Sequence, residues 1–118
     1  MPARLENLAG RWTILLISAL TLAVGGADRR LADAVENRDE QTVRALLEQQ
    51  VEVDTAQADG ATALHWAAYW DDSETADMLL DAGAAVDPTN DLGVTPLSLA
   101  CTNGSIAMVT RLLKAGAS

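Results

Sequence analysis

A repeat length of 33 residues organises most of this chain of 118 residues. Two separate blocks agree on it: residues 60–67 match 93–100, and residues 78–84 match 111–117. Leu31 lies one more period before Leu64, so it belongs to a first copy, and that copy has diverged further. Repeats of this length are small units that cannot bury their apolar faces alone and therefore stack on their neighbours. The sequence predicts a row of about three such units rather than one globular core.

Each unit is expected to begin with a short helix. Thr62 and Thr95 are suited to cap these helices, because a threonine oxygen can accept the free amide hydrogens of the first turn. Pro96 fits the first helical position, where no amide donor is missed. Apolar residues then recur at three- and four-residue spacing and predict the buried face of each first helix. These residues are Leu64, Ala67, Ala68, Leu97, Ala100 and Cys101.

A second helix is expected in each unit, over about residues 73–82 and 105–115. Gly83 and Gly116 follow these helices, where a positive φ favours glycine, and the first unit has Gln50 at the same place. The third unit has no further repeat behind it in the sequence, so its outer apolar residues are expected to be partly uncovered. These residues are Ile106, Val109 and Leu112.

The openings of the second and third units resemble a known family. Thr-Ala-Leu-His-Trp-Ala at 62–67 and Thr-Pro-Leu-Ser-Leu-Ala at 95–100 resemble the Thr-Pro-Leu-His-x-Ala signature of ankyrin repeats. Ala63 replaces the proline of that signature, and Ser98 replaces the histidine. The resemblance implies an all-α ankyrin-repeat solenoid of about three helix-turn-helix units, in which His65 hydrogen-bonds to neighbouring loops.

The resemblance covers residues 28–118 and implies three divisions there. A divergent first repeat is expected over about 28–57, a second repeat over 58–90 and an incomplete third repeat over 91–118.

Residues 1–27 differ in character from the repeats. Arg4 and Arg11 precede a short apolar core, and small residues follow that core up to Ala27. This order is typical of a secretory signal peptide, here a hydrophobic signal helix that is cut after Ala27. The apolar core is shorter than the roughly 20 residues that span a bilayer, but a retained membrane anchor and an ordinary buried helix stay open as alternatives. We expect a secreted or periplasmic bacterial protein, or one that residues 12–27 anchor to the inner membrane.

The charge balance restricts the partners. The chain has 17 acidic and 8 basic residues and a net charge of −9, so it offers little to replace the counterions of a nucleic acid. A protein partner with a basic patch fits better, and a membrane is expected as a partner only if residues 1–27 are retained. Cys101 is the single cysteine, which excludes an intrachain disulfide and a zinc site built from several thiolates.

The sequence offers no positive sign of an enzyme. It contains no Gly-rich phosphate loop, no metal-binding His pair and no Ser/His/Asp arrangement, and His65 is the only histidine. The acidic run from Asp71 to Asp77 lacks the glycine and the final bidentate glutamate of a calcium loop, so we interpret it as solvated surface. No catalytic, cofactor or metal site is expected.

The resemblance implies binding through the projecting loops and the exposed side of the first helices. Tyr69 and Trp70 are the main candidate anchors, because tyrosine and tryptophan bury a large area at low entropy cost and are enriched in hot spots. The alternative for this pair is that one of the two covers a gap between repeats, whereas Trp66 is expected to be structural. The candidate binding residues are Glu36, Asn37, Asp59, Ala61, Tyr69, Trp70, Asp91, Leu92, Val94, Thr102 and Asn103.

The expected function is that of a protein-protein interaction module that acts through its concave loop and inner-helix face. Two alternatives stay open. One is an inhibitor or immunity-type protein that blocks an enzyme, for which the acidic composition is the support. The other is an N-terminal accessory domain of a longer enzyme, whose catalytic part would lie beyond Ser118.

Overall fold

The computed structural model describes residues 28–118, and the expected signal peptide or anchor in residues 1–27 lies outside them. The described residues form six helices and no strand, in pairs that follow the expected repeats. The pairs are α2 (Arg30–Glu36) with α3 (Glu40–Glu48), α4 (Ala63–Tyr69) with α5 (Ser73–Asp81), and α6 (Pro96–Asn103) with α7 (Ile106–Lys114). Over these residues no helix is both long enough and apolar enough to cross a bilayer.

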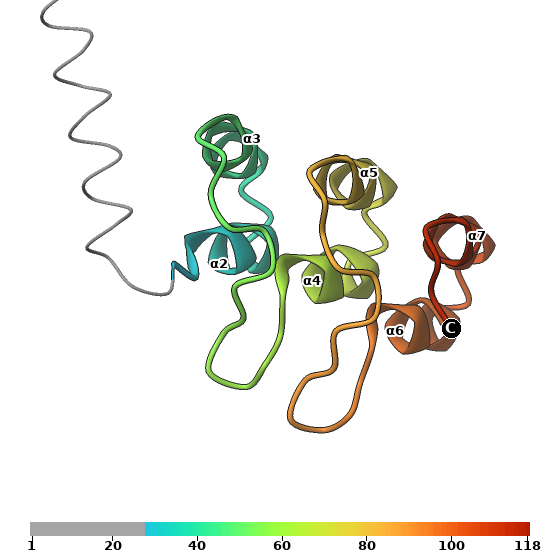
Figure 1. The fold of residues 1–118 in the computed structure, drawn as a ribbon. Helices are drawn as coiled ribbons and strands as arrows, with labels where there is room; N and C mark the ends of the chain where they lie inside the picture. The colour runs from blue at the N-terminus through green and yellow to red at the C-terminus, as the bar shows by residue number, and fades with distance from the viewer. Residues whose placement is uncertain (1–27) are drawn as a thin grey trace, which may run out of the picture.

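The helices lie in two layers (Figure 1). The inner helices α2, α4 and α6 pack side by side, and α3, α5 and α7 form an outer layer above them. The loops that join one pair to the next project beyond the inner layer, on the side away from the outer helices (Figure 1). The apolar core lies between the layers and is continuous along the stack, as expected for repeats that bury their faces against each other. Its largest buried side chains include Leu31, Val43, Leu64, Leu79, Met108 and Leu112.

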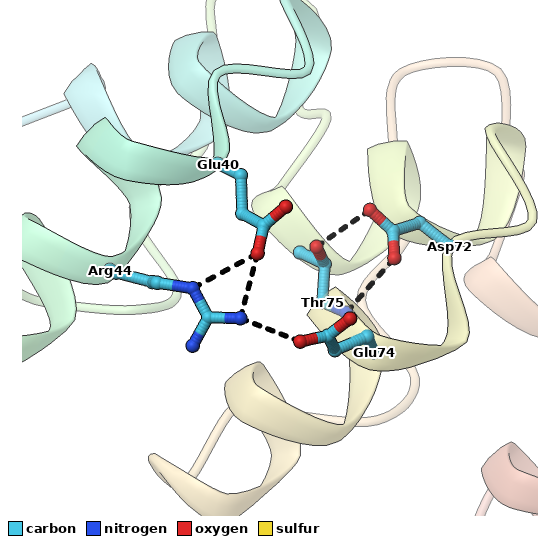
Figure 2. Close-up of polar contacts among 5 residues, drawn as sticks. All are labelled: Glu40, Arg44, Asp72, Glu74 and Thr75. Carbon is cyan, nitrogen blue, oxygen red and sulfur yellow. Dashed lines mark hydrogen bonds and ion pairs between the residues drawn. The ribbon is translucent and has the colours of Figure 1, made fainter.

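Side-chain caps start the helices where the sequence predicts them. Thr62 and Thr95 each accept a hydrogen bond from the backbone N–H three residues on, and Pro96 occupies the first turn of α6. Asp72 caps α5: one carboxylate oxygen accepts from the backbone N–H of Thr75 at 3.1 Å and the other from its hydroxyl at 2.7 Å (Figure 2). Each cap satisfies amide groups that have no partner within the helix. The ends of α5 and α7 lie within one residue of the expected positions.

The second residue after the end of each outer helix has the expected left-handed backbone. Gly83 and Gly116 have φ of +92° and +106°, and Gln50 has φ of +58° at the same place in the first repeat. The turn between the two helices of a repeat also needs a positive φ, which Arg38 and Asp71 adopt without being glycine. The earlier repeats therefore carry backbone strain that glycine would relieve.

Two burial predictions in the third repeat are wrong. Cys101 is exposed, although its counterpart Ala68 is fully buried. The difference arises because α6 packs against α4, whereas no described helix packs against the far side of α6. Leu112 is also fully buried, since it faces the core, whereas Ile106 is 83% exposed as expected and Leu113 is exposed as well.

Candidate interaction surface

The ends of the three inner helices carry most of the candidate residues, and hydrogen bonds hold these ends together. The indole Nε1 of Trp70 donates to the backbone carbonyl of Glu36 at 3.1 Å, which joins the second repeat to the first. The side-chain amide of Asn103 donates to the carbonyls of Ala68 and Tyr69, both at 3.0 Å, which joins the third repeat to the second. The structure thus brings residues of three repeats into one surface.

The two projecting loops are also joined. The backbone N–H of Asp91 donates to the carbonyl of Asp59 at 2.8 Å. Gly60 makes this approach possible, because a Cβ at that position would lie 2.9 Å from the Cα of Asn90, too close for a side chain. Leu92 lies beside this contact at the tip of the second loop and is 85% exposed.

Three aromatic rings follow one another at the end of α4. The ring centroids of Trp66 and Tyr69 are 5.3 Å apart at an interplanar angle of 77°, and those of Tyr69 and Trp70 are 4.9 Å apart at 81°. These edge-to-face contacts hold the rings in fixed orientations. Tyr69 is 50% exposed and Trp70 is 37% exposed.

Trp70 is the member of the row that spans two repeats. Besides its bond to the carbonyl of Glu36, its ring lies 5.2 Å from the guanidinium carbon of Arg38, a cation–π arrangement. Trp70 therefore has structural contacts to the preceding repeat, and Tyr69 is the more exposed of the two rings.

Gln57, which was not a candidate, connects the aromatic row to two carboxylates. Its side-chain oxygen accepts from the indole Nε1 of Trp66 at 2.9 Å. Its amide nitrogen donates to Asp33 at 2.8 Å and to Glu36 at 3.1 Å. Two acidic side chains therefore share one neutral donor and lie close together, which makes this part of the surface negative. No periodicity marks Gln57 in the sequence, since it lies in a loop.

His65 is structural, as expected. It is buried, and the backbone N–H of Thr62 donates to its Nδ1 at 3.0 Å. An atom that accepts from an amide carries no proton, so the proton is on Nε2, which donates to the carbonyl of Val94 at 2.8 Å. The neutral ring satisfies both neighbours and ties α4 to the next loop.

Some candidate residues have little to offer a partner. Ala61 is buried, with only 4% of its surface exposed. Val94 is half-buried and its carbonyl is occupied by His65. Thr102 is exposed, but its hydroxyl donates to the carbonyl of Ser98 within its own helix. We omit Ala61 and Val94 from the surface described below.

The basic side chains that form ion pairs lie mostly on the outer helices. Arg44 of α3 bridges Glu40 at 2.7 Å and Glu74 of α5 at 2.6 Å (Figure 2), and Arg111 of α7 pairs with Asp77 at 3.0 Å. At the start of α2, the hydrogen bond from Arg30 lowers the pKa of Asp28 from its ordinary value.

The carboxylates of the inner side have no such partners. Within residues 28–118 no ion pair reaches Asp33, Glu36, Asp59 or Asp91, so the inner surface keeps its negative charge. The same residues contain no group of three or more His, Cys, Asp or Glu side chains that could hold a metal ion.

The described chain is thus a solenoid of helix pairs linked by projecting loops, with an aromatic and acidic inner surface. A family model of ankyrin repeats, in three copies, matches residues 31–118. The chain belongs to the ankyrin-repeat family. Members of this family generally act as protein-protein interaction modules, and the fold is typically non-enzymatic.

The chain is similar to short parts of longer proteins. It is 33% identical over 72 residues to palmitoyltransferase AKR1 of Lachancea kluyveri, and the matched segment makes up 61% of this chain and 10% of that protein. It is 48% identical over 44 residues to the ankyrin repeat protein nuc-2 of Neurospora crassa, and this segment makes up 37% of this chain and 4% of that protein. These relatives are eukaryotic and give no support to the expected bacterial origin.

A solved structure shows the same arrangement of repeats. The crystal structure of the human ASB11 ankyrin repeat domain matches with a TM-score of 0.69 and 33% sequence identity. The match covers 75% of this chain and 40% of the other.

Proposed function

We propose that residues 28–118 bind another protein through one surface, which we call the inner face. The family supports an interaction role in general, and the geometry of the inner-helix ends and loops supports this side of the molecule. The inner face consists of Glu36, Asn37, Asp59, Tyr69, Trp70, Asp91, Leu92, Thr102 and Asn103.

The observation that carries the proposal is the half-exposed ring of Tyr69 within a rigid aromatic row. Its neighbours Trp66 and Trp70 hold it edge-to-face, and the carbonyl of Tyr69 is bound by the amide of Asn103. A large side chain that is already fixed loses little conformational freedom when a partner covers it. Leu92 adds exposed apolar area on the adjacent loop.

The charge of the inner face supports a partner with a basic patch. Asp59, Asp91 and Glu36 form no ion pair among the described residues, and complementary charge accelerates association and restricts the choice of partner. An inhibitor of a basic enzyme would use the same surface in the same way.

A second candidate is an accessory domain of a longer protein. The chain matches only 10% of a protein named palmitoyltransferase and 4% of another ankyrin repeat protein, so segments like this one occur within much longer chains. In that setting the inner face would bind a substrate protein or another domain.

Export is a further part of the proposal and rests on residues 1–27 alone, where a basic flank, an apolar core and small residues follow in that order. Intact-mass measurement and N-terminal sequencing of fractionated protein test it. A soluble product that begins near Asp28 supports a secreted or periplasmic protein, a full-length membrane product supports an anchor, and a full-length soluble product contradicts both.

Capture of partners by photo-cross-linking tests the binding proposal. Full-length protein is compared with a Tyr69→Ala/Leu92→Ser variant and with a control variant, Ile106→Ser/Leu113→Ser, which removes similar exposed apolar area from α7. Circular dichroism first confirms that the variants are folded. We expect the inner-face variant to lose the specific cross-links at least about tenfold and the control to retain them. If only the control variant lost these cross-links, the binding surface would lie on α7 and the inner-face proposal would be contradicted.

A further inference from the structure

A small pocket opens between the two projecting loops and the inner helices α4 and α6. It has a volume of about 200 Å³. Its walls include Trp66, Tyr69 and His65 from α4, Leu99 from α6, and Asp59, Ala61 and Asn90 from the loops. Pockets for drug-sized ligands usually have volumes of about 300–1,000 Å³. This pocket is therefore suited to one side chain of a partner rather than to a cofactor.

The pocket combines aromatic walls with one carboxylate. The rings of Trp66 and Tyr69 contact each other edge-to-face at 77°, and both residues line the pocket. Asp59 accepts a hydrogen bond from the backbone N–H of Ala61 at 3.0 Å through Oδ1, which fixes the orientation of the carboxylate. Among the described residues, no hydrogen bond is donated to Oδ2.

We infer that this pocket takes the side chain of an arginine from the bound partner. A guanidinium is planar, stacks on aromatic rings and donates two parallel hydrogen bonds to a carboxylate. In this pocket the stack would form on Tyr69 or Trp66 and the paired bonds would go to Asp59. The inference rests on the proposed binding role of the inner face and specifies its partner.

Other side chains fit the same surroundings less well. An acidic side chain would meet the carboxylate of Asp59, which repels it. An apolar side chain would cover the carboxylate of Asp59 and remove its water without replacing it. A lysine would supply the charge but neither the flat surface nor the paired donors.

The same surface already contains one arginine–aromatic contact. The guanidinium of Arg38 lies 5.2 Å from the ring centroid of Trp70, at the other end of the aromatic row. The row thus stacks with an arginine of the chain itself at one end, and the pocket at its other end is open.

The first test uses small probes whose side chains differ in one property. N-acetyl-N′-methylamides of arginine, citrulline, lysine and norleucine are titrated into the full chain, and the indole N–H resonance of Trp66 is followed by NMR. Citrulline has the shape of arginine without its charge. We expect a saturable shift with arginine and binding at least about fivefold weaker with each of the other three.

Matched variants locate the contact. Asp59→Asn removes the charge but keeps an oxygen that can accept from Ala61, and Asp91→Asn removes the same charge outside the pocket. We expect Asp59→Asn to weaken binding of the arginine probe about tenfold, Tyr69→Ala to weaken it to a similar extent, and Asp91→Asn to change it less than about twofold. Equal effects of the two aspartate variants would show that the probe responds to the general negative charge of the surface, and would overturn the assignment of the arginine to this pocket.

A peptide selection separates this inference from the proposed function. A random peptide library is selected on the full chain and on its Asp59→Asn variant. We expect arginine to be enriched only on the unchanged protein. Peptides that need Tyr69 and Leu92 but show no preference for arginine would overturn the pocket assignment and leave the proposed function intact. Selected peptides that are insensitive to both residues would contradict the inner face as the binding surface.

Discussion

The imidazole Nε2 of His65 lies 2.8 Å from the carbonyl oxygen of Val94, and this bond joins the inner helix of the second repeat to the loop that leads into the third. The other ring nitrogen accepts from the backbone N–H of Thr62 at 3.0 Å. Among residues 28–118, the side chain of Ser98, the counterpart of His65 one repeat later, hydrogen-bonds only to Thr95 of its own repeat. One position in the repeat is therefore used in two different ways.

Replacing His65 with alanine should lower the free energy of unfolding by about 3 kcal/mol, because the amide of Thr62 and the carbonyl of Val94 both lose a partner at a largely buried place. Ser98→Ala, the matched change in an exposed and purely local cap, should cost about 1 kcal/mol or less. Urea unfolding followed by circular dichroism measures both. Equal losses would show that the bond between repeats contributes nothing beyond the cap.

Replacing Gln50 with glycine should stabilise the protein by about 1 kcal/mol, because the backbone there has φ of +58° and glycine adopts this conformation without strain. The reverse change, Gly83→Gln, should destabilise it by a similar amount, since a Cβ at Gly83 would meet no other atom within 4 Å and only the backbone opposes it. Thermal unfolding of the two single variants compares them. A destabilised Gln50→Gly variant would contradict the assignment of strain.

The carboxyl of Asp39 should titrate below its ordinary pKa of 3.8, because the hydroxyl of Thr42 donates to it at 2.6 Å and the backbone N–H of Thr42 at 3.2 Å. A pKa that is lower in the folded state stabilises the fold above pH 3.8, and this contribution is lost as the pH falls through the folded value. NMR titration of the carboxyl carbon measures it. In Thr42→Val the pKa should return toward 3.8, and an unchanged midpoint in that variant would exclude the hydroxyl as the main cause.

The thiol of Cys101 should react with a chromogenic disulfide reagent nearly as fast in the folded protein as in urea, because the side chain is exposed. A cysteine at the counterpart position, in the variant Ala68→Cys/Cys101→Ser, should react at least about 100-fold more slowly, since α6 covers that position and reaction would require local opening. Equal rates would mean that α4 and α6 separate readily.

The sequence predicts the local parts of this structure well. The helix starts follow from Thr62, Thr95 and Pro96, whose side chains act on backbone groups only a few residues away. The number of repeats follows from the 33-residue period, because each stacked unit carries the same apolar pattern as its neighbours. The role of His65 follows from the resemblance and is confirmed.

Contacts between repeats could not be predicted from such local signals. Trp70 reaches the carbonyl of Glu36, which is 34 residues earlier, and Gln57 links Trp66 to two acidic residues of the first repeat. The Trp70 contact recurs one repeat later, where Asn103 donates to the carbonyl of Tyr69, but the two donor side chains differ in type, so residue identity gives no signal for it. The error at Cys101 has a related cause: burial in a stack depends on the next unit as well as on the residue itself.

The two layers of the stack are held together by different kinds of contact. The inner helices are held by close apolar packing, whereas α3 and α5 are bridged by the exposed pair of Arg44 and Glu74, and α5 and α7 by Arg111 and Asp77. Exposed pairs weaken as salt screens them, and buried apolar contacts do not weaken in this way. The contacts between the outer helices are therefore the ones that rising ionic strength weakens, and those between the inner helices are less sensitive to it.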